Sequence, residues 1–231
     1  MIISINKSKG ATSHDVVDVI RKKLGVKKVG HTGTLDPMAE GVLIILTGED
    51  TKRQSEFMNM EKEYIAEIVF GVESDTYDLD SPNIRFQDKK PTIRNKKEKL
   101  IQILKSFVGE VKQEVPPYSA VKIKGKPLYI YARRGLIKTP LPQRKILIKK
   151  LELLEIGEIF VLLSRQQYNI KRQKYPYIKI KVICSKGTYI RSLAIDIGKK
   201  LGCVAVLSSL TRTRIGAYTL EGCSKYATNC L

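Results

Sequence analysis

The chain has 231 residues, 42% of them hydrophobic, and its 42 lysines and arginines against 23 acidic residues give a formal net charge of +19. A chain of this length and composition is long enough to bury a core, so disorder is not the default expectation, and no apolar run reaches the length of a membrane span. The charge favours a polyanionic partner, because basic side chains that bind phosphates release counterions. Compositional drift toward lysine is the alternative explanation, and charge alone does not separate RNA from DNA.

The first two predicted elements are a strand at residues 2–5 and a helix that follows a Lys-Gly turn. Thr12 and Ser13 are candidates for the N-terminal cap of this helix, and Gly25 stands just past its end. Its apolar residues recur at helical spacing, namely at Val16, Val17, Ile20 and Leu24. We therefore expect an amphipathic helix that packs on one face.

Residues 26–41 are rich in glycine, and they predict an ordered loop rather than a helix or a strand. The apolar residues 42–46 predict a buried strand, and a helix is expected near residues 50–58. Residues 64–70 are apolar and rich in β-forming residues, and the acidic turn at residues 73–78 flanks them. They therefore predict a central strand.

The middle of the chain predicts a second helix at residues 92–107, closed by Gly109, because its apolar residues again recur at helical spacing. Residues 118–127 predict a hairpin arm that is crowded with basic residues. A short helix at residues 128–134 is expected behind this arm.

Two further strands are predicted at residues 145–156 and 177–184, followed by a helix at residues 188–200 and a strand at residues 204–211. Between the first two strands, the basic stretch at residues 164–175 is either an RNA-contacting loop or a variable solvated loop. Most connections are too short for helical crossovers. This favours an α+β fold with one continuous, mixed and largely antiparallel central sheet, flanked by helices and hairpin loops.

Asp36 is the first candidate for chemistry, because it lies beside Pro37 in the glycine-rich loop, close to His31, one of only two histidines. A carboxylate held on a stiff loop near a basic surface suits a nucleophile or a general base. Taken alone, however, an Asp-Pro pair in a glycine-rich loop is more often a turn.

A second cluster is the turn that ends in a helix capped by Thr188, with Arg191 in its first turn. The electropositive helix end and this arginine would hold a carboxylate ionised, although an ordinary capped helix is the alternative.

Several kinds of site are not supported by the sequence. It contains no phosphate-binding G-x-x-x-x-G-K-[ST] run, no dinucleotide-binding G-x-G-x-x-G and no G-x-S-x-G nucleophile elbow. The four cysteines form no C-x-x-C pair and have no histidine nearby, so a zinc site is not expected. They are Cys184, Cys203, Cys223 and Cys230. Free thiols fit a reducing compartment, and we expect a cytoplasmic protein.

Residues 30–41, GHTGTLDPMAEG, resemble the signature loop of the TruB-type pseudouridine synthases, the tRNA pseudouridine-55 synthase family. Four other landmarks of that family occur in the same order, at Asn6-Lys7 with Lys9-Gly10, at Lys62-Glu63-Tyr64, at residues 115–122 and at residues 185–191. The resemblance runs from about residue 3 to about residue 220, and the combination of five motifs is specific. It implies the pseudouridine synthase fold.

The resemblance implies that Asp36 is the nucleophile that attacks the target nucleoside as uracil is detached, before the base rejoins its ribose through carbon. Tyr64 would stack on the uracil and help to handle its C5 proton, and Arg191 would pair with Asp36. The implied substrate-binding residues are His31, which fills the place of the flipped nucleotide, together with Tyr64, Tyr189, Leu210 and Lys7. No metal and no cofactor are implied.

The implied substrate is tRNA, recognised at its T-loop and T-stem and modified at uridine 55, and neither a DNA nor a membrane partner is expected. We expect a monomer in which residues 1–231 form one catalytic domain, without an appended C-terminal RNA-binding (PUA) domain. The departures from the family pattern are Ser8, Asp80-Ser81 and the stretch at residues 164–175. The alternatives are a guide-RNA-type synthase acting on ribosomal RNA, a non-catalytic basic RNA-binding protein and, less well supported, a nucleoside hydrolase.

Overall fold

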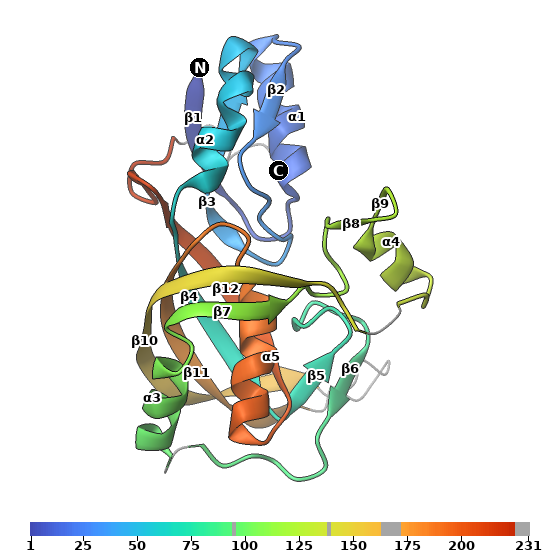
Figure 1. Cartoon of the computed structure of the whole chain (residues 1–231), viewed down its shortest axis with the longest axis vertical. Coiled ribbons are helices and arrows are strands. Elements are labelled where there is room, and N and C mark those ends of the chain that lie inside the picture. The colour runs from blue at the N-terminus through green and yellow to red at the C-terminus, as the bar shows by residue number, and fades with distance from the viewer. Residues whose placement is uncertain (94–95, 138–139, 163–171, 225–231) are drawn as a thin grey trace. The chain divides into compact units, whose positions relative to one another are not determined.

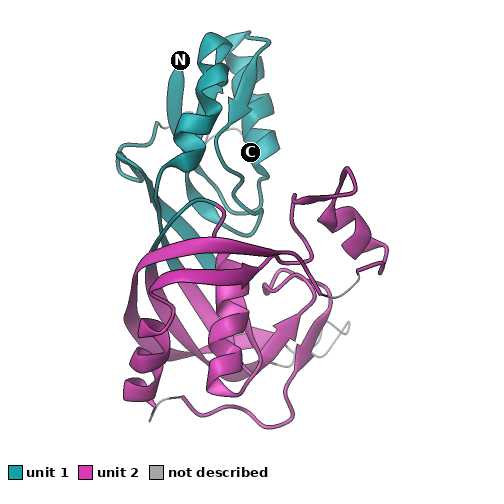
Figure 2. Ribbon diagram, in the orientation of Figure 1, with its two compact units in different colours: residues 1–65, 182–186, 209–231 teal, residues 66–181, 187–208 magenta. Residues whose placement is uncertain are grey.

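The structure of the chain, a computed structural model, describes residues 1–93, 96–137, 140–162 and 172–224. The chain folds into two compact units, which are coloured separately in Figure 2. Unit 1 consists of residues 1–65, 182–186 and 209–231, and unit 2 consists of residues 66–181 and 187–208. Each unit is therefore assembled from segments that are distant in the sequence.

Unit 1 contains the N-terminal elements, most of which are labelled in Figure 1. They are β1 (Ile2–Lys7), α1 (Ser13–Leu24), β2 (Val29–His31), β3 (Glu40–Thr47), the 3-10 helix η1 (Gly48–Arg53) and α2 (Gln54–Asn59), with the short strand β13 (Tyr218–Thr219) added later in the chain. The helix predicted near residues 50–58 is present, but its first residues form a 3-10 helix rather than an α-helix.

Unit 2 contains the predicted hairpin arm and most of the longer strands. Its own elements are β5 (Val72–Ser74), β6 (Ile84–Phe86), α3 (Lys97–Lys105), β7 (Gly109–Glu114), β8 (Lys122–Ile123), β9 (Lys126–Pro127), α4 (Leu128–Arg133), β10 (Gln143–Leu162) and α5 (Ile190–Leu201). Strands β8 and β9 pair as an antiparallel hairpin with α4 directly behind it, which confirms the arm predicted from the sequence.

Three strands contribute residues to both units, namely β4 (Lys62–Phe70), β11 (Arg172–Cys184) and β12 (Ala205–Ile215). The main sheet has the strand order β1-β3-β12-β4-β11-β10-β7, with β2 added to β3 and β13 to β12. Strand β4 lies in the middle of this order, as predicted. Strands β3 and β12 pair in parallel, whereas β1 with β3 and β7 with β10 pair antiparallel. The predicted α+β fold with a mixed, largely antiparallel sheet is confirmed.

Strand β3 forms the centre of unit 1 and is buried on both faces. One face packs against α1 in a cluster of Ile5, Val16, Val17, Ile20, Leu43 and Ile45. The other face packs against α2 and the end of β12 in a cluster of Val42, Ile44, Leu46, Phe57 and Ile215. A strand covered on both sides needs apolar residues at every position, which is why its uninterrupted apolar run was recognisable in the sequence.

Helix α1 begins and ends where its sequence predicts. The Thr12 hydroxyl accepts a hydrogen bond from the Asp15 N–H at 3.1 Å, and the Asp15 carboxylate accepts one from the Thr12 N–H at 2.8 Å. This reciprocal capping box satisfies two amide groups that the helix itself cannot pair. Gly25 ends the helix in the left-handed conformation with φ of 63°.

The core of unit 2 is formed by strands and covered by helices. One apolar cluster of this unit comprises Val69, Val72, Val161, Tyr175 and Val206. Helix α5, orange in Figure 1, buries Ile190, Leu193, Ala194, Ile197 and Leu201, and α3 contacts both α5 and β10.

Among the described residues, no helix is both long enough and apolar enough to cross a membrane.

The prediction that residues 26–41 are neither helix nor strand is wrong at β2. Residues 29–31 pair antiparallel with β3, and the flanking hydrogen bonds from the Thr32 N–H to the Ile44 carbonyl and from the Gly48 N–H to the Lys28 carbonyl are 3.0 and 2.8 Å long. A strand of three residues is too short to show an alternating pattern, and it exists because the edge of β3 supplies its partners.

The helix predicted at residues 92–107 is also shorter than expected, since α3 spans only Lys97–Lys105. It begins after Lys96, which supplies no side-chain cap, and Gly109 opens β7 instead of closing the helix. Strand β7 itself was not predicted, because its mixture of charged residues gives it no apolar face.

The expectation of one continuous sheet holds for the main sheet, but the described chain also contains two separate ribbons, β5 with β6 and β8 with β9. Glu73 and Ser74, assigned from the sequence to the acidic turn, belong to β5. Of the basic stretch at residues 164–175, residues 164–171 lie outside the described residues, whereas residues 172–175 begin β11.

Gly41 marks the closest approach of β3 to β12, and replacing it with alanine should destabilise the protein by about 3 kcal/mol. Its φ of 111° disfavours any residue with a side chain, and a Cβ atom here would lie 2.3 Å from the Arg212 carbonyl oxygen. Urea unfolding measures the loss. Gly30→Ala is the matched control, because no atom lies within 4 Å of a Cβ at that position. A cost below about 1 kcal/mol for Gly41→Ala would show that the strands can separate without penalty.

Candidate active site

The loop that carries Asp36 is tied to the start of α1. The Ser13 hydroxyl accepts a hydrogen bond from the Leu35 N–H at 2.9 Å and donates one to the Leu35 carbonyl at 3.1 Å. On the other side of Asp36, the Pro37 carbonyl accepts a hydrogen bond from the Gly10 N–H at 2.8 Å. The backbone is therefore held on both sides of Asp36, as a reacting carboxylate requires.

Tyr64 and Leu210 supply a buried tyrosine and a buried apolar side chain in the same unit. Tyr64 is 8% exposed on β4, and Leu210 is 6% exposed on β12, the neighbouring strand. Burial raises the pKa of the Tyr64 phenol, and the charge of Arg212, with its contact to the hydroxyl, offsets part of this rise. Tyr64 therefore carries a neutral phenol at neutral pH.

Lys7 is completely buried at the end of β1. Its Nζ donates hydrogen bonds to the carbonyls of Ser8 and Ala11, at 2.9 and 2.7 Å, so it shapes the turn that precedes α1. Burial lowers the pKa of Lys7 to about 8, with Asp36 opposing this shift and Arg212 adding to it. These contacts give Lys7 a structural task next to the Asp36 loop.

His31 ends β2 with a half-buried side chain. Burial lowers the pKa of His31, and the neighbouring charges of His14 and Arg212 lower it further, which favours a neutral ring. Its Nδ1 atom is buried and has no hydrogen-bond partner among the described residues. The ring therefore retains an unused polar atom.

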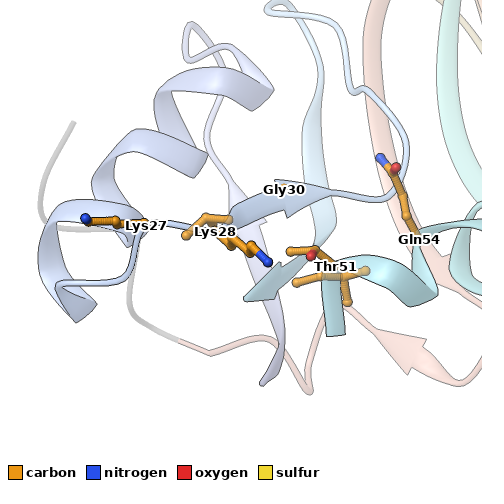
Figure 3. A pocket seen from close by; sticks show the side chains of 7 residues that line it. Lys27, Lys28, Gly30, Thr51 and Gln54 are labelled. Atoms are coloured by element: carbon orange, nitrogen blue, oxygen red, sulfur yellow. The ribbon is translucent and has the colours of Figure 1, made fainter. Parts of the chain in front are cut away.

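A shallow basic cavity lies on the α2 side of β2 (Figure 3). Its volume is about 260 Å³, and Lys27, Lys28, Val29, Gly30, Leu46, Thr51 and Gln54 line it. The Gln54 side-chain amide donates a hydrogen bond to the His31 carbonyl at 2.8 Å, so the cavity adjoins the backbone of this predicted site residue. In Figure 3 the Lys28 ammonium lies beside Thr51, whereas that of Lys27 points away, so Lys28 supplies the positive charge that a phosphate group would need.

Arg191 lies in unit 2, in the first turn of α5, and is 5% exposed. Its guanidinium donates hydrogen bonds to the carbonyls of Thr76 at 2.7 Å and Tyr118 at 3.0 Å. The Asp78 carboxylate lies 3.9 Å away and forms an ion pair with it. Two segments, the acidic turn at residues 76–78 and the chain at Tyr118, thus fix the position of this side chain.

The acidic turn around Asp78 is itself well ordered by hydrogen bonds. The Asp78 carboxylate accepts bonds from the Thr76 hydroxyl at 2.8 Å and from the Asp80 N–H at 3.2 Å. Asp75 accepts bonds from Ser81 at 2.5 Å and from the Tyr118 hydroxyl at 3.2 Å. Ser81, one of the departures from the family pattern, thus has a role in the turn.

The prediction that Thr188 caps the last helix is wrong. Helix α5 begins at Ile190, and its N-cap is Tyr189, which makes no side-chain cap. The Gln113 side chain of β7 accepts a bond from the Tyr189 N–H at 2.8 Å and donates one to the Tyr189 carbonyl at 3.0 Å. A side chain distant in the sequence thus takes over the task that a local cap would perform.

The predicted site residues fall into two groups. Unit 1 contains Asp36, Tyr64, His31, Leu210 and Lys7, and unit 2 contains Tyr189 and Arg191. Asp36 and Arg191 belong to different units, and their pairing stays a prediction.

Sequence reasoning missed Arg212, Asp78 and Lys62 as functional candidates. Arg212 is 1% exposed and Lys62 is 6% exposed. Arg212 on β12 lies two positions from Leu210, and Lys62 on β4 lies two positions from Tyr64, so this alternation of strand residues was the available signal for both. Asp78 lies in the acidic turn, and its only signal was the charge of that turn. In the parts of the chain that the structure describes, no three histidine, cysteine or acidic side chains gather as metal ligands would.

Residues 21–190 match the family described as TruB family pseudouridylate synthase (N terminal domain). The chain belongs to this TruB family. Its expected class, a pseudouridine synthase and hence an isomerase, is confirmed by this match and by its relatives.

Curated relatives of this TruB chain carry the name tRNA pseudouridine synthase B. The protein from Protochlamydia amoebophila is 45% identical over 96% of this chain and 76% of its own length. The proteins from Alkaliphilus oremlandii and Parabacteroides distasonis are each 42% identical, over 66% and 88% of their lengths.

Solved structures show the same fold. A Cbf5-Nop10-Gar1 complex aligns with a TM-score of 0.64 and 30% identity over 94% of this TruB chain. An H/ACA RNP bound to a substrate RNA containing 2'-deoxyuridine aligns with a TM-score of 0.61 and 28% identity. This chain spans about half the length of these two matched chains, 49% and 48%.

The buried lysines of this TruB chain should make it more stable at pH 9 than at pH 7. In the unfolded chain Lys7 keeps its proton up to about 10.5, whereas in the folded chain it releases it near 8. Unfolding therefore takes up a proton between these values, and stability rises as the pH passes 8. Lys62, whose pKa burial also lowers to about 8, acts in the same direction. Each lysine contributes about 1 kcal/mol between pH 7 and pH 9.

Urea unfolding at pH 7, 8 and 9 measures this rise. Lys7→Met should reduce it by about half, because one of the two buried lysines is gone. The exposed Lys126 provides the control Lys126→Met, which should leave the pH dependence unchanged. A Lys7→Met variant with the pH dependence of the wild type would contradict the assignment.

Proposed function

We propose that this chain converts a uridine of tRNA, uridine 55 in the T-loop, to pseudouridine, with Asp36 as the nucleophile. The observation that carries the proposal is the Asp36 loop. Its backbone is held by Ser13 and Gly10, and Tyr64 lies near enough for the Asp36 charge to raise the pKa of the phenol. A fixed carboxylate near a buried, neutral aromatic ring suits attack on a nucleoside whose base must stack.

The proposed reaction needs no co-reactant. The Asp36 carboxylate attacks the nucleoside as the bond between uracil N1 and ribose C1′ breaks. The detached base turns, its C5 atom bonds to C1′, the carboxylate leaves and the C5 proton is lost, while N1 gains a proton. The product therefore has the same atoms as the substrate, as an isomerisation requires.

Three other side chains have proposed roles in handling the base. The neutral Tyr64 phenol stacks on uracil, and its hydroxyl helps to move the C5 proton. The neutral ring of His31 fills the space that the flipped nucleotide leaves, since an inserted ring recovers part of the lost stacking. Arg191, held by Thr76, Tyr118 and Asp78, pairs with Asp36 and keeps it oriented.

The remaining proposed site residues bind the substrate or support the site. Tyr189 and Leu210 line the uracil pocket, and Lys7 orders the turn beside it. The net charge of +19 and the basic cavity next to His31 support a polyanionic partner, which we propose to be the T-loop and T-stem of tRNA. The proposed working form is a monomer in the cytoplasm, with residues 1–231 as one catalytic domain.

A guide-RNA-dependent synthase is the second candidate, since the solved complexes that align with this chain include an H/ACA RNP. The tRNA assignment is favoured because the curated relatives named for tRNA are 40–45% identical, whereas these complexes are 25–30% identical.

A single experiment separates these candidates. The purified protein is incubated with an unmodified tRNA transcript, without guide RNA or other proteins, and pseudouridine is mapped at each uridine. We expect one modified position in the T-loop and none in a transcript with cytidine there. Modification only with a guide RNA present would support the second candidate, free uracil would indicate a nucleoside hydrolase, and tRNA binding without any product would indicate a non-catalytic RNA-binding protein.

A further inference from the structure

Among the described residues, Arg212 is one of the largest side chains with less than 2% of its surface exposed. It lies on β12 directly opposite Gly41 of β3, in the parallel register of these two strands. Keeping a guanidinium out of water is costly unless its donors are satisfied. An aliphatic side chain would pack this position without that cost, so the arginine calls for an explanation beyond core packing.

The donors of Arg212 are directed at the backbone on both sides of Asp36. Its Nε donates to the Val42 carbonyl at 2.7 Å, and its two terminal nitrogens donate to the carbonyls of Thr34 at 3.4 Å and Gly33 at 3.2 Å. Gly33 and Thr34 precede Asp36, and Val42 follows it. One rigid, planar group therefore spans the two ends of the loop that presents the carboxylate.

The same guanidinium reaches Tyr64. Its charge and its contact with the hydroxyl both lower the pKa of the phenol against the larger effect of burial. Strand β12 lies between β3 and β4 in the sheet, so Arg212 sits between the strand that follows Asp36 and the strand that carries Tyr64. In the described residues, the hydrogen bonds of Arg212 go to carbonyl groups rather than to carboxylates.

We propose that Arg212 is a positioning residue, whose guanidinium holds the Asp36 loop and the Tyr64 hydroxyl in the one geometry that the isomerisation uses; this inference rests on the function proposed above. The task requires directional donors as well as charge. A lysine keeps the charge, but it has one nitrogen and cannot bridge carbonyls on both ends of the loop while also reaching Tyr64.

The test compares Arg212→Lys and Arg212→Gln with the wild type in single-turnover reactions on the tRNA transcript. We expect the rate constant for pseudouridine formation to fall about 10²-fold in both variants, while the dissociation constant for tRNA changes by less than about threefold. Rates are expressed per molecule competent to bind tRNA, which removes the effect of unfolded protein. Arg214→Gln is the matched control, because this arginine on the same strand pairs with Glu61 instead.

A second measurement tests the connection to Tyr64. If Arg212 acts partly through the Tyr64 hydroxyl, then Arg212→Lys should cost at least about threefold less in a Tyr64→Phe background than in the wild type. Equal losses in the two backgrounds would overturn the link to Tyr64.

The inference as a whole would be overturned by an Arg212→Lys variant that reacts at the wild-type rate, or by a loss that appears only in tRNA affinity. Its failure is distinguishable from failure of the proposed function, because in the latter case the wild type itself forms no pseudouridine in tRNA.

Discussion

The Asp36→Asn variant is expected to form no measurable pseudouridine while it still binds tRNA. Asparagine has nearly the same shape, so the hydrogen bonds that Ser13 and Gly10 make to the loop should persist. An amide, however, is neither a nucleophile nor a base at neutral pH. Removing a nucleophile costs at least about 10³-fold in rate, which here means loss of detectable product.

Release of the C5 hydrogen from labelled tRNA uridine measures this effect, and a filter-binding assay measures the affinity for tRNA. We expect the affinity to change by less than about threefold, because phosphate contacts dominate it. Asp18→Asn on α1 is the control, since it removes an exposed carboxylate without touching the loop. Hydrogen release at a rate near that of the wild type would rule out Asp36 as the nucleophile.

The second large effect is expected at Arg191, where replacement by lysine should slow the reaction about 10²-fold. The Arg191 guanidinium is held by the carbonyls of Thr76 and Tyr118 and by the Asp78 carboxylate. On the pairing proposed above, a lysine could not satisfy these partners and also present a second donor to Asp36. The Asp36 carboxylate should then lose its orientation, whereas the positive charge that the proposed pairing supplies is kept.

Single-turnover rates and thermal unfolding are measured together, because Arg191 is buried and its loss also affects stability. The rate should fall even at temperatures where the variant is fully folded. Arg85→Lys is the matched control, since Arg85 also lies in unit 2 but is 81% exposed. If folded Arg191→Lys protein reacts as fast as the wild type, Arg191 does not orient the nucleophile.

The elements that sequence reasoning located well are those whose signals are local. Helix α1 has its capping box, its apolar face and its terminal glycine within 14 residues, from Thr12 to Gly25. Strand β3 reads as an apolar run because both of its faces are buried. The glycine-rich motif around Asp36 is equally local, and so the candidate nucleophile was recognisable without a structure.

The elements that were mislocated depend on partners far away in the chain. Strand β2 exists because the edge of β3 pairs with it, and α5 starts at Ile190 because Gln113 takes the place of a cap. Gln113 is 76 residues from Tyr189. No pattern within a few residues of Thr188 could have revealed that partner.

By itself, the sequence determined the α+β fold class, the family and the identity of the candidate nucleophile, because periodicity, capping and short motifs act over a few neighbouring residues. Only the tertiary structure decided what surrounds that nucleophile. Arg212 meets the Val42 carbonyl across 170 positions of sequence, and it does so only once β12 has paired with β3. Buried hydrogen-bond donors find their partners through such packing, and local sequence carries no record of it.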